Sequence, residues 1–225
     1  MPTKRTTVFS AVRSHPMQYR LEILEKQLCY EGFFRLEAYR LRHELFAGGW
    51  SEVIEREVLQ RGHAAALMPY DPQLDCVCMI EQFRIGALAD SKGPWLLEFI
   101  AGIIEEGESP EQVARREAVE EGGLRVTELL PVSVFSLSPG GCTERIHLFC
   151  GRVNAENAGG IHGLVEEGED ILLRVVPFSD ALALLRSQKI TSATAIIALQ
   201  WLALNRDWLR EQWRSRGAGS ERPFG

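Results

Sequence analysis

Residues 101–124, AGIIEEGESPEQVARREAVEEGGL, contain seven glutamates, at positions 105, 106, 108, 111, 117, 120 and 121. The tetrapeptide SPEQ at 109–112 has the form of a capping box, with a hydroxyl at the N-cap, proline at the first helical position and glutamine at the third. The double glycine at 122–123 suits a helix end, because glycine readily adopts the left-handed conformation found there. The segment therefore predicts a helix that begins near residue 110 and ends just before the double glycine.

Three carboxylates of this helix share one face. At about 100° per residue, Glu117, Glu120 and Glu121 fall within one stripe. They lie in the last turn, where the helix dipole is negative and disfavours anions. Arg115 and Arg116 can pair with them, but such a pair contributes only about 0.3–0.5 kcal/mol. A divalent cation would offset the repulsion more fully, and clustered carboxylates without His or Cys favour Mg²⁺ or Mn²⁺ over zinc.

The alternative interpretation of these glutamates is a solvated acidic helix face, which is common on surface helices. Their spacing argues against it, because the segment fits the pattern G-x5-E-x7-R-E-U-x-E-E-x-G-U, where U is aliphatic. The matching residues are Gly102, Glu108, Arg116, Glu117, Ala118, Glu120, Glu121, Gly123 and Leu124. The segment resembles the Nudix box of hydrolases that act on nucleoside diphosphates linked to another moiety.

The resemblance implies a loop-helix-loop on an α/β/α sandwich, in which glutamates hold the divalent ions that bind a pyrophosphate. This agrees with the chemistry, since a pyrophosphate repels hydroxide until a metal neutralises it. The resemblance gives supporting roles within the box to Gly102, Glu108, Arg116, Glu120 and Gly123.

The composition of the whole chain limits the classes of protein to which it can belong. Its 225 residues are 45% hydrophobic, which is enough for a core in one large domain or two small ones. The net charge of −6 argues against a general nucleic-acid binder. The five cysteines lack C-x-x-C spacing, so we expect reduced and mostly buried thiols. Without a signal peptide or an apolar run of about 20 residues, we expect a soluble cytoplasmic protein.

The order of strand and helix signals indicates an α+β fold. Charged and apolar residues alternate at 21–46, which predicts exposed strands with one covered face, in an N-terminal sheet or dimerisation arm. HAAALMPY and CVCMIEQFRI around the turn DPQLD predict a hairpin, and PWLLEFIAG predicts one further strand. FSDALALLRSQ and TSATAIIALQWLALNRDWLREQW predict two closing helices, each with a Ser or Thr cap.

Outside the box, seven stretches resemble segments of bacterial ADP-ribose pyrophosphatases within the Nudix family. They are YEGFF, RGHAAALMPYDP, IEQFRIGA, PWLLEFIAGIIEEGES, SPGG, GIHGLVEEGEDI and IIALQWL. Pro139, 15 residues beyond Leu124, is at a spacing typical of these members. The resemblance implies a strand-rich N-terminal dimerisation subdomain at residues 1–55 and a Nudix hydrolase domain at 56–213. The composition of the tail RSRGAGSERPFG predicts disorder at 214–225.

The resemblance also assigns the metal ligands and the general base. The carbonyl of Ala101 and the carboxylates of Glu117, Glu121 and Glu169 resemble the metal ligands. Glu167 resembles the general base, and a mobile loop can bring such a base over the metal site when substrate is bound. EEGED at 166–170 offers several acids, so the neighbouring carboxylates stay open as alternatives for the base.

The remaining assignments concern the substrate. Arg56, Glu57, Arg61 and Arg84 resemble positions that line the ADP-ribose pocket, and the arginine fork suits phosphate. Ser138, Pro139, Gly140 and Glu144 resemble a loop at the terminal ribose. Phe33 and Phe34 resemble aromatic residues that reach the adenine of the partner subunit's substrate, in a dimer with exchanged N-terminal sheets. Core packing is the alternative for both phenylalanines. The histidines form no ligand cluster, and we expect them to be structural.

These implications describe a homodimeric, Mg²⁺-dependent hydrolase, with Mn²⁺ as the alternative ion. It would convert ADP-ribose and water into AMP and ribose 5-phosphate. Two alternatives stay open: hydrolysis of another nucleotide sugar, such as GDP-mannose or ADP-glucose, and a non-catalytic sensor that binds ADP-ribose. The intact box favours catalysis over sensing, and the acidic balance disfavours RNA decapping.

Overall fold

The computed structural model describes residues 19–217, with side chains described as far as residue 213. The chain divides into two compact units, Met1–Val58 and Leu59–Gly225. None of the helices in the described residues is long and apolar enough to cross a membrane. Residues 218–225 of the predicted tail lie outside the described part of the chain.

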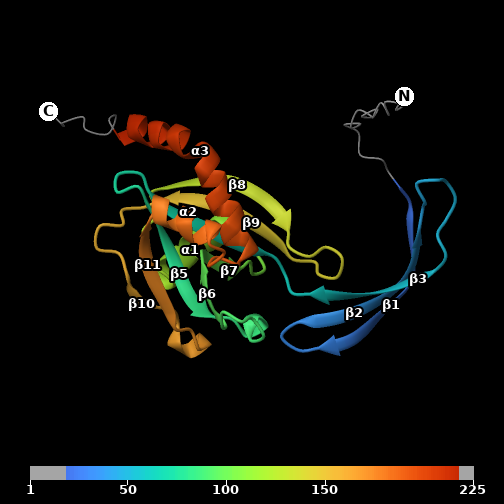
Figure 1. Ribbon diagram of the computed structural model, residues 1–225. Helices are drawn as coiled ribbons and strands as arrows, with labels where there is room; N and C mark the ends of the chain where they lie inside the picture. Colours follow the sequence, from blue (N-terminus) through green and yellow to red (C-terminus); the bar gives the residue numbers. More distant parts are fainter. Residues whose placement is uncertain (1–18, 218–225) are drawn as a thin grey trace, which may run out of the picture. The chain divides into compact units, whose positions relative to one another are not determined.

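The first unit is built around a three-stranded antiparallel sheet, drawn in blue and cyan in Figure 1. Its order is β1 (Leu21–Glu31), β2 (Arg35–His43) and β3 (Ile54–Gln60), whose last two residues belong to the second unit. The exposed strands expected at 21–46 are confirmed: β1 is exposed along nearly its whole length, and β2 is partly covered.

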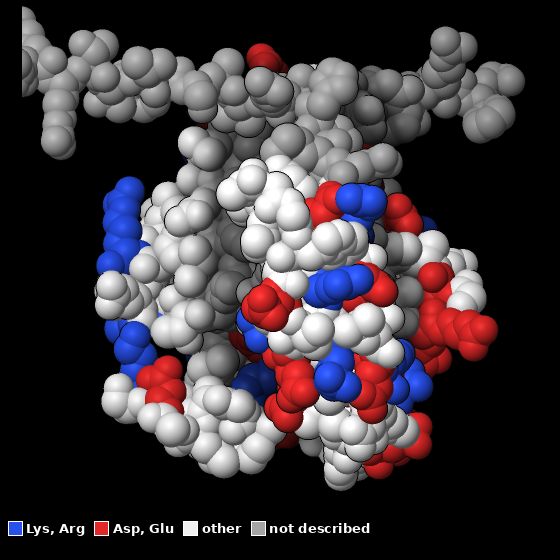
Figure 2. Space-filling model, turned by 90° about the vertical axis from the view of Figure 1, so that its right-hand side faces the viewer, with Lys and Arg blue, Asp and Glu red and all other residues white. Residues whose placement is uncertain are grey.

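Cross-strand ion pairs join β1 to β2. Arg40 lies 3.1 Å from Glu25, and Arg42 lies 2.6 Å from Glu22. Figure 2 shows one face of the molecule on which acidic and basic side chains lie close together. Because exposed pairs of this kind contribute at most about 1 kcal/mol each, they help to set the strand register more than the stability.

The second unit is built around an eight-stranded sheet in which β10-β11-β5-β4-β9-β8 follow one another, while β6 pairs with β5 and β7 with β4. Its strands are β4 (Ala64–Asp71), β5 (Cys76–Phe83), β6 (Trp95–Glu98), β7 (Ile100–Ile103), β8 (Glu128–Ser136), β9 (Arg145–Arg152), β10 (Gly160–His162) and β11 (Ile171–Pro177). The helices are α1 (Pro110–Glu120), α2 (Phe178–Arg186) and α3 (Ala193–Gly217), with the short 3₁₀ turns η1 (Ile85–Ala87) and η2 (Val165–Glu167). The predicted hairpin is confirmed, because β4 and β5 pair antiparallel with Tyr70 opposite Val77.

Helices cover both faces of this sheet, which confirms the α/β/α sandwich (Figure 1). Successive residues of β4 point to opposite faces. Ala65 and Leu67 belong to the core that includes α1, whereas the alternate residues Ala64, Ala66 and Met68 belong to the core that includes α2 and α3. The fully buried β4 strand therefore holds the box helix on one face and the two C-terminal helices on the other.

Helix α1 has the predicted ends. Ser109 Oγ accepts from the N–H of Gln112 at 3.2 Å, and Gln112 Oε1 accepts from the N–H of Ser109 at 2.8 Å, which is the reciprocal capping box. At the other end, Gly123 has a φ of +59°, its N–H donates to the Val119 carbonyl and the N–H of Leu124 donates to the Ala118 carbonyl, so a left-handed glycine ends the helix. The local signals in the sequence thus place the helix correctly.

Three expectations about the elements need correction. PWLLEFIAG forms two strands instead of one, because the chain passes from pairing with β5 to pairing with β4 at the buried Phe99. Helix α2 has Pro177 at its N-cap and no side-chain cap, and Ser179 lies inside the helix. Helix α3 continues to Gly217, so residues 214–217 of the predicted tail are helical.

The described cysteines are free thiols, as expected. Cys76, Cys78 and Cys150 are buried, and Cys29 is exposed. Cys76 and Cys78 lie in the same core as α1, on the common face that their alternate positions in β5 predict.

Candidate active site

The C-terminal end of α1 directs Glu117 and the C-cap residue Glu121 into the protein. Glu117 and Glu121 are 9% and 3% exposed. Gly102 of β7 leaves the space that Glu117 occupies, because a Cβ at residue 102 would lie 1.7 Å from Glu117 Oε1. The backbone N–H of Ala101 donates to Glu121 Oε2 at 3.0 Å. The strand that precedes the box therefore positions both carboxylates.

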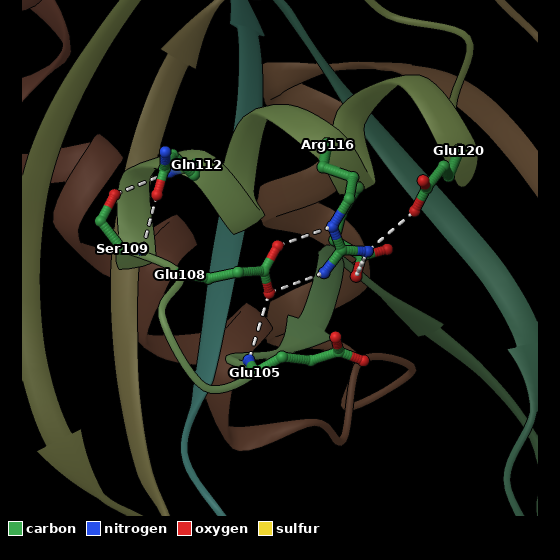
Figure 3. A network of polar contacts seen from close by, with 7 residues as sticks. Glu105, Glu108, Ser109, Gln112, Arg116 and Glu120 are labelled. Carbon is green, nitrogen blue, oxygen red and sulfur yellow. Dashed lines mark hydrogen bonds and ion pairs between the residues drawn. The ribbon is translucent and has the colours of Figure 1, made fainter.

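Arg116 connects the helix to the loop before it (Figure 3). Its Nη1 donates to Glu117 Oε1 at 2.8 Å and to Glu120 Oε2 at 2.9 Å. Its Nε and Nη2 face the two oxygens of Glu108 at 3.2 and 3.3 Å. Glu108 Oε2 also accepts from the N–H of Glu105 at 3.1 Å. One guanidinium thus holds three carboxylates, and the turn around Glu105 is fastened to the helix.

Burial makes the two inward carboxylates difficult to ionise. Burial raises the pKa of Glu117 to about 7, although the neighbouring Arg116 opposes this rise. Burial also raises the pKa of Glu121 to about 8, against the hydrogen bond from Ala101. The charge of Glu169 raises both pKa values further, so its carboxylate lies in the same electrostatic environment. The site contains more negative charge than its own arginine neutralises.

Glu167 and Glu169 lie on the loop between β10 and β11. Glu169 Oε2 accepts from the N–H of Leu164 at 3.0 Å, which folds the loop back on itself. Gly168 between the two acids has a φ of +73°, a conformation that favours glycine. Glu167 is exposed, whereas Glu169 is half-buried. In this loop Glu169 is therefore hydrogen-bonded to the protein, whereas the exposed Glu167 is accessible to a substrate.

Hard divalent cations suit this set of oxygen ligands. As they stand, no three His, Cys, Asp or Glu side chains within residues 19–217 are arranged to hold a metal ion. Glu117, Glu121 and Glu169 each accept a hydrogen bond from the chain's own N–H groups. An ionised carboxylate has two oxygens with about four acceptor positions, so these hydrogen bonds leave acceptor positions for an ion on each side chain. The residues fit a cation all the same, since burial and mutual repulsion disfavour their charge.

Comparison with known families identifies this arrangement. The family described as NUDIX domain matches residues 60–196, which span the whole acidic site. The chain belongs to the Nudix family. It is similar to the ADP-ribose pyrophosphatase of Escherichia coli (strain K12), with 50% identity over 193 residues that cover 86% of this chain and 92% of the relative. The ADP-ribose pyrophosphatase of Haemophilus influenzae is 48% identical over 203 residues, covering 89% of this chain and 94% of the relative.

More distant relatives are named GDP-mannose pyrophosphatases. The GDP-mannose pyrophosphatase of Pectobacterium atrosepticum is 34% identical over 193 residues, covering 85% of this chain and 98% of the relative. A solved structure titled as an ADP compounds hydrolase shares the fold, with a TM-score of 0.64 and 22% identity over 88% of this chain and 98% of that one. The family and its close relatives establish a Nudix diphosphatase.

Two of the predicted substrate arginines lie in the Nudix unit, each beside a carboxylate. Arg61 Nε is 3.3 Å from the buried Glu144, and Arg84 Nε donates to Glu98 at 2.7 Å. The charge of Arg84 lowers the pKa of Glu121, which places this arginine in the electrostatic environment of the acidic site. Glu98 was not predicted as a site residue. The β5–β6 hairpin brings it to Arg84, and recognising a hairpin at residues 84–94 would have indicated the pair.

The predicted ribose loop is exposed at Ser138, Pro139 and Gly140. It is attached to the second unit through its next residues: the N–H of Leu59 donates to the Gly141 carbonyl at 2.8 Å, and the N–H of Thr143 donates to the Leu59 carbonyl at 3.1 Å. The tip is therefore accessible to a ligand while its base is held by backbone hydrogen bonds.

The other predicted substrate residues belong to the first unit. Phe33 is 85% exposed, so core packing is excluded for it within the described chain. Its ring contacts that of Phe34 edge to face, with centroids 4.9 Å apart. Arg56 and Glu57 are both exposed on β3. Their contact with a substrate stays a prediction.

Proposed function

We propose that this Nudix enzyme hydrolyses the pyrophosphate bond of ADP-ribose and releases AMP and ribose 5-phosphate. The observation that carries this proposal is the similarity to proteins named ADP-ribose pyrophosphatase. It reaches 50% identity and covers 92% of the Escherichia coli relative. The GDP-mannose pyrophosphatases in the same comparison are only 30–34% identical to this chain.

The metal site consists of the Ala101 carbonyl, Glu117, Glu121 and Glu169, with Mg²⁺ as the ion and Mn²⁺ as the alternative. The bound ion supplies Lewis-acid polarisation of the pyrophosphate and lowers the pKa of the attacking water. Within the chain, Gly102 keeps the space in which Glu117 lies. Arg116 orients Glu117, and the N–H of Ala101 orients Glu121.

Glu167 is the general base. It is exposed on η2, and the left-handed Gly168 beside it provides a turn that connects the base to Glu169. In this position Glu167 can accept the proton of the attacking water, while Glu169 holds the end of the loop near Glu117 and Glu121. The exposed Glu166 is the neighbouring alternative for this role.

Arginine forks and exposed loops bind the rest of the substrate. Arg61 and Arg84 donate to the diphosphate, and Glu144 and Glu98 hold their guanidinium groups in orientation. Ser138, Pro139, Gly140 and Glu144 bind the terminal ribose. Arg56 and Glu57 contact the substrate, and Phe33 and Phe34 stack on adenine.

The active form is a homodimer with exchanged N-terminal sheets. This proposal is supported by exposed apolar side chains on β1, because such side chains are typical of surfaces that a partner covers. They are Leu21, Ile23, Leu28 and Tyr30. Residues 1–55 form the dimerisation part and 56–213 the catalytic part. The protein acts in the cytoplasm on a small nucleotide sugar.

One experiment tests the reaction. The protein is incubated with ADP-ribose, ADP-glucose, GDP-mannose and NADH, with Mg²⁺ or with EDTA, and the products are separated. We expect AMP and ribose 5-phosphate to form fastest from ADP-ribose and only with the ion. Faster cleavage of GDP-mannose would instead place the chain with its more distant relatives. Tight binding of ADP-ribose without any product would favour a sensor.

A further inference from the structure

The acidic loop, residues 163–170, is closed at its base by the β10–β11 pair. His162 is the last residue of β10 and lies opposite Ile171, the first residue of β11. Inside the loop, Glu169 Oε2 accepts from the N–H of Leu164 at 3.0 Å, and the N–H of Glu169 donates to the Leu164 carbonyl at 3.2 Å. The position of Glu169 therefore follows that of the residues at the start of the loop.

Two contacts attach the start of this loop to the end of helix α1. The N–H of Gly163 donates to the carbonyl of Glu120 at 3.1 Å. The His162 ring packs on Gly123, since a Cβ at residue 123 would lie 2.9 Å from the ring Cε1 and 3.4 Å from Nδ1. We call these two contacts the loop clamp.

The two glycines of the clamp, Gly123 and Gly163, lack a side chain, and a neighbouring side chain occupies the space beside each of them. Gly123 has a φ of +59° and Gly163 a φ of +100°, so each residue adopts a conformation unfavourable for other amino acids. A Cβ at residue 163 would lie 2.7 Å from the Cβ of Glu169. The imidazole of His162 thus takes the space next to Gly123, and Glu169 takes the space next to Gly163.

The ring of His162 is itself oriented by the backbone. Its Nε2 lies 3.1 Å from the carbonyl of Gly159, which accepts the ring N–H. The ring is half-buried and its other nitrogen faces Gly123. The ring therefore serves packing and orientation, because one nitrogen lies at the Gly159 carbonyl and the other beside Gly123.

From these contacts we infer that His162 is a positioning residue, which holds the acidic loop on the C-terminal end of α1 and so sets Glu167 and Glu169 relative to Glu117 and Glu121. The inference rests on the proposed function for its catalytic consequence. The contact itself can be tested without substrate.

The test compares His162→Ala and His162→Phe with the unmodified full chain. Phenylalanine keeps a flat ring against Gly123 but has no nitrogen for the Gly159 carbonyl. Hydrogen exchange of the amides at 163–169 is measured in EDTA, and kcat and KM for ADP-ribose are measured with Mg²⁺. Lys189→Ala is the control, because Lys189 is exposed between α2 and α3 and outside the proposed site.

For His162→Ala we expect exchange at 163–169 to become at least about tenfold faster, because the opening of the loop costs less. We expect kcat to fall by about 10- to 100-fold while KM changes by less than about threefold, since the loop acids are misplaced more than the binding residues. His162→Phe should keep slow exchange and most of kcat. If His162→Ala does not fold, His162→Gln is measured in its place, because it also lacks the ring.

Unchanged exchange and unchanged kcat in His162→Ala would overturn the inference. Faster exchange with normal kcat would also overturn it, because the clamp would then hold the loop without serving catalysis. If His162→Phe showed the same faster exchange and the same loss of kcat as His162→Ala, packing of the ring on Gly123 would be refuted as the cause. If the unmodified protein does not hydrolyse ADP-ribose, the proposed function fails, and the exchange measurement alone decides the clamp.

Discussion

Gly102→Ala changes the candidate site by a single methyl group whose position is defined. A Cβ at residue 102 would lie 1.7 Å from Oε1, 2.2 Å from Cδ and 2.6 Å from Cγ of Glu117. Ordinary contacts begin near 3.4 Å, so the oxygen must retreat by about 1.7 Å. Gly102 does not have a positive φ, so alanine adds no backbone strain there. The clash falls on the flexible end of one side chain and should displace the carboxylate without unfolding the sheet.

A misplacement of about 1 Å at a reacting centre can cost about 100-fold in rate, equivalent to about 2.7 kcal/mol of transition-state stabilisation. We therefore expect kcat/KM for ADP-ribose to fall by at least about 100-fold, with a melting temperature within about 4 °C of the unmodified protein. Steady-state kinetics at several Mg²⁺ concentrations and thermal unfolding measure the two quantities. Calorimetric titration with Mg²⁺ should show weaker binding.

Gly86→Ala is the matched control. A Cβ at Gly86 has no atom within 4 Å, and its φ is not positive. Its activity and stability should match those of the unmodified protein. Equal kcat/KM values for Gly102→Ala and Gly86→Ala would refute the argument that the position of the Glu117 carboxylate determines the rate.

Five further substitutions test other parts of the structure. Glu117→Gln and Glu121→Gln should each lower kcat by orders of magnitude with the fold retained, because the amide keeps the size but loses the ligand charge; near-normal kcat would remove that residue from the metal site. Glu167→Gln should lower kcat with little change in KM, and an equal loss in Glu166→Gln alone would move the base by one residue. The hydrogen bond from Arg206 lowers the pKa of Asp75. Asp75 therefore contributes stability above its unfolded pKa of about 4, and this is lost as pH falls through the lower folded pKa. The difference in urea midpoint between the unmodified protein and Asp75→Asn should shrink from about pH 5 to pH 2, and a constant difference would contradict the assignment.

Local signals in the sequence were sufficient for the box helix. The capping box at 109–112 and the left-handed Gly123 are present as predicted, because both depend on hydrogen bonds between residues three to six positions apart. The alternation of β4 and β5 likewise predicted the hairpin and the shared face of Cys76 and Cys78. The identity of the family followed from the same short segment.

Other expectations failed where long-range pairing decided the outcome. Periodicity cannot distinguish one strand from two that change partners, and the chain does change partners at Phe99. Ser179 has the composition of a cap, but the turn out of β11 places Pro177 at the N-cap of α2. In both cases the neighbouring strands determined where each element begins and ends.

The sequence by itself determined the helix, the order of its carboxylates and hence the reaction class, because these depend on spacing along one chain. Only the tertiary structure decided that Gly102 makes room for Glu117, that Glu98 holds Arg84, and that His162 packs on Gly123. Each of these contacts joins segments 14 or more residues apart, brought together by sheet pairing and by the burial of α1 on β4. The physical reason is that burial and close approach depend on how whole elements pack, and no local pattern of side chains encodes that packing.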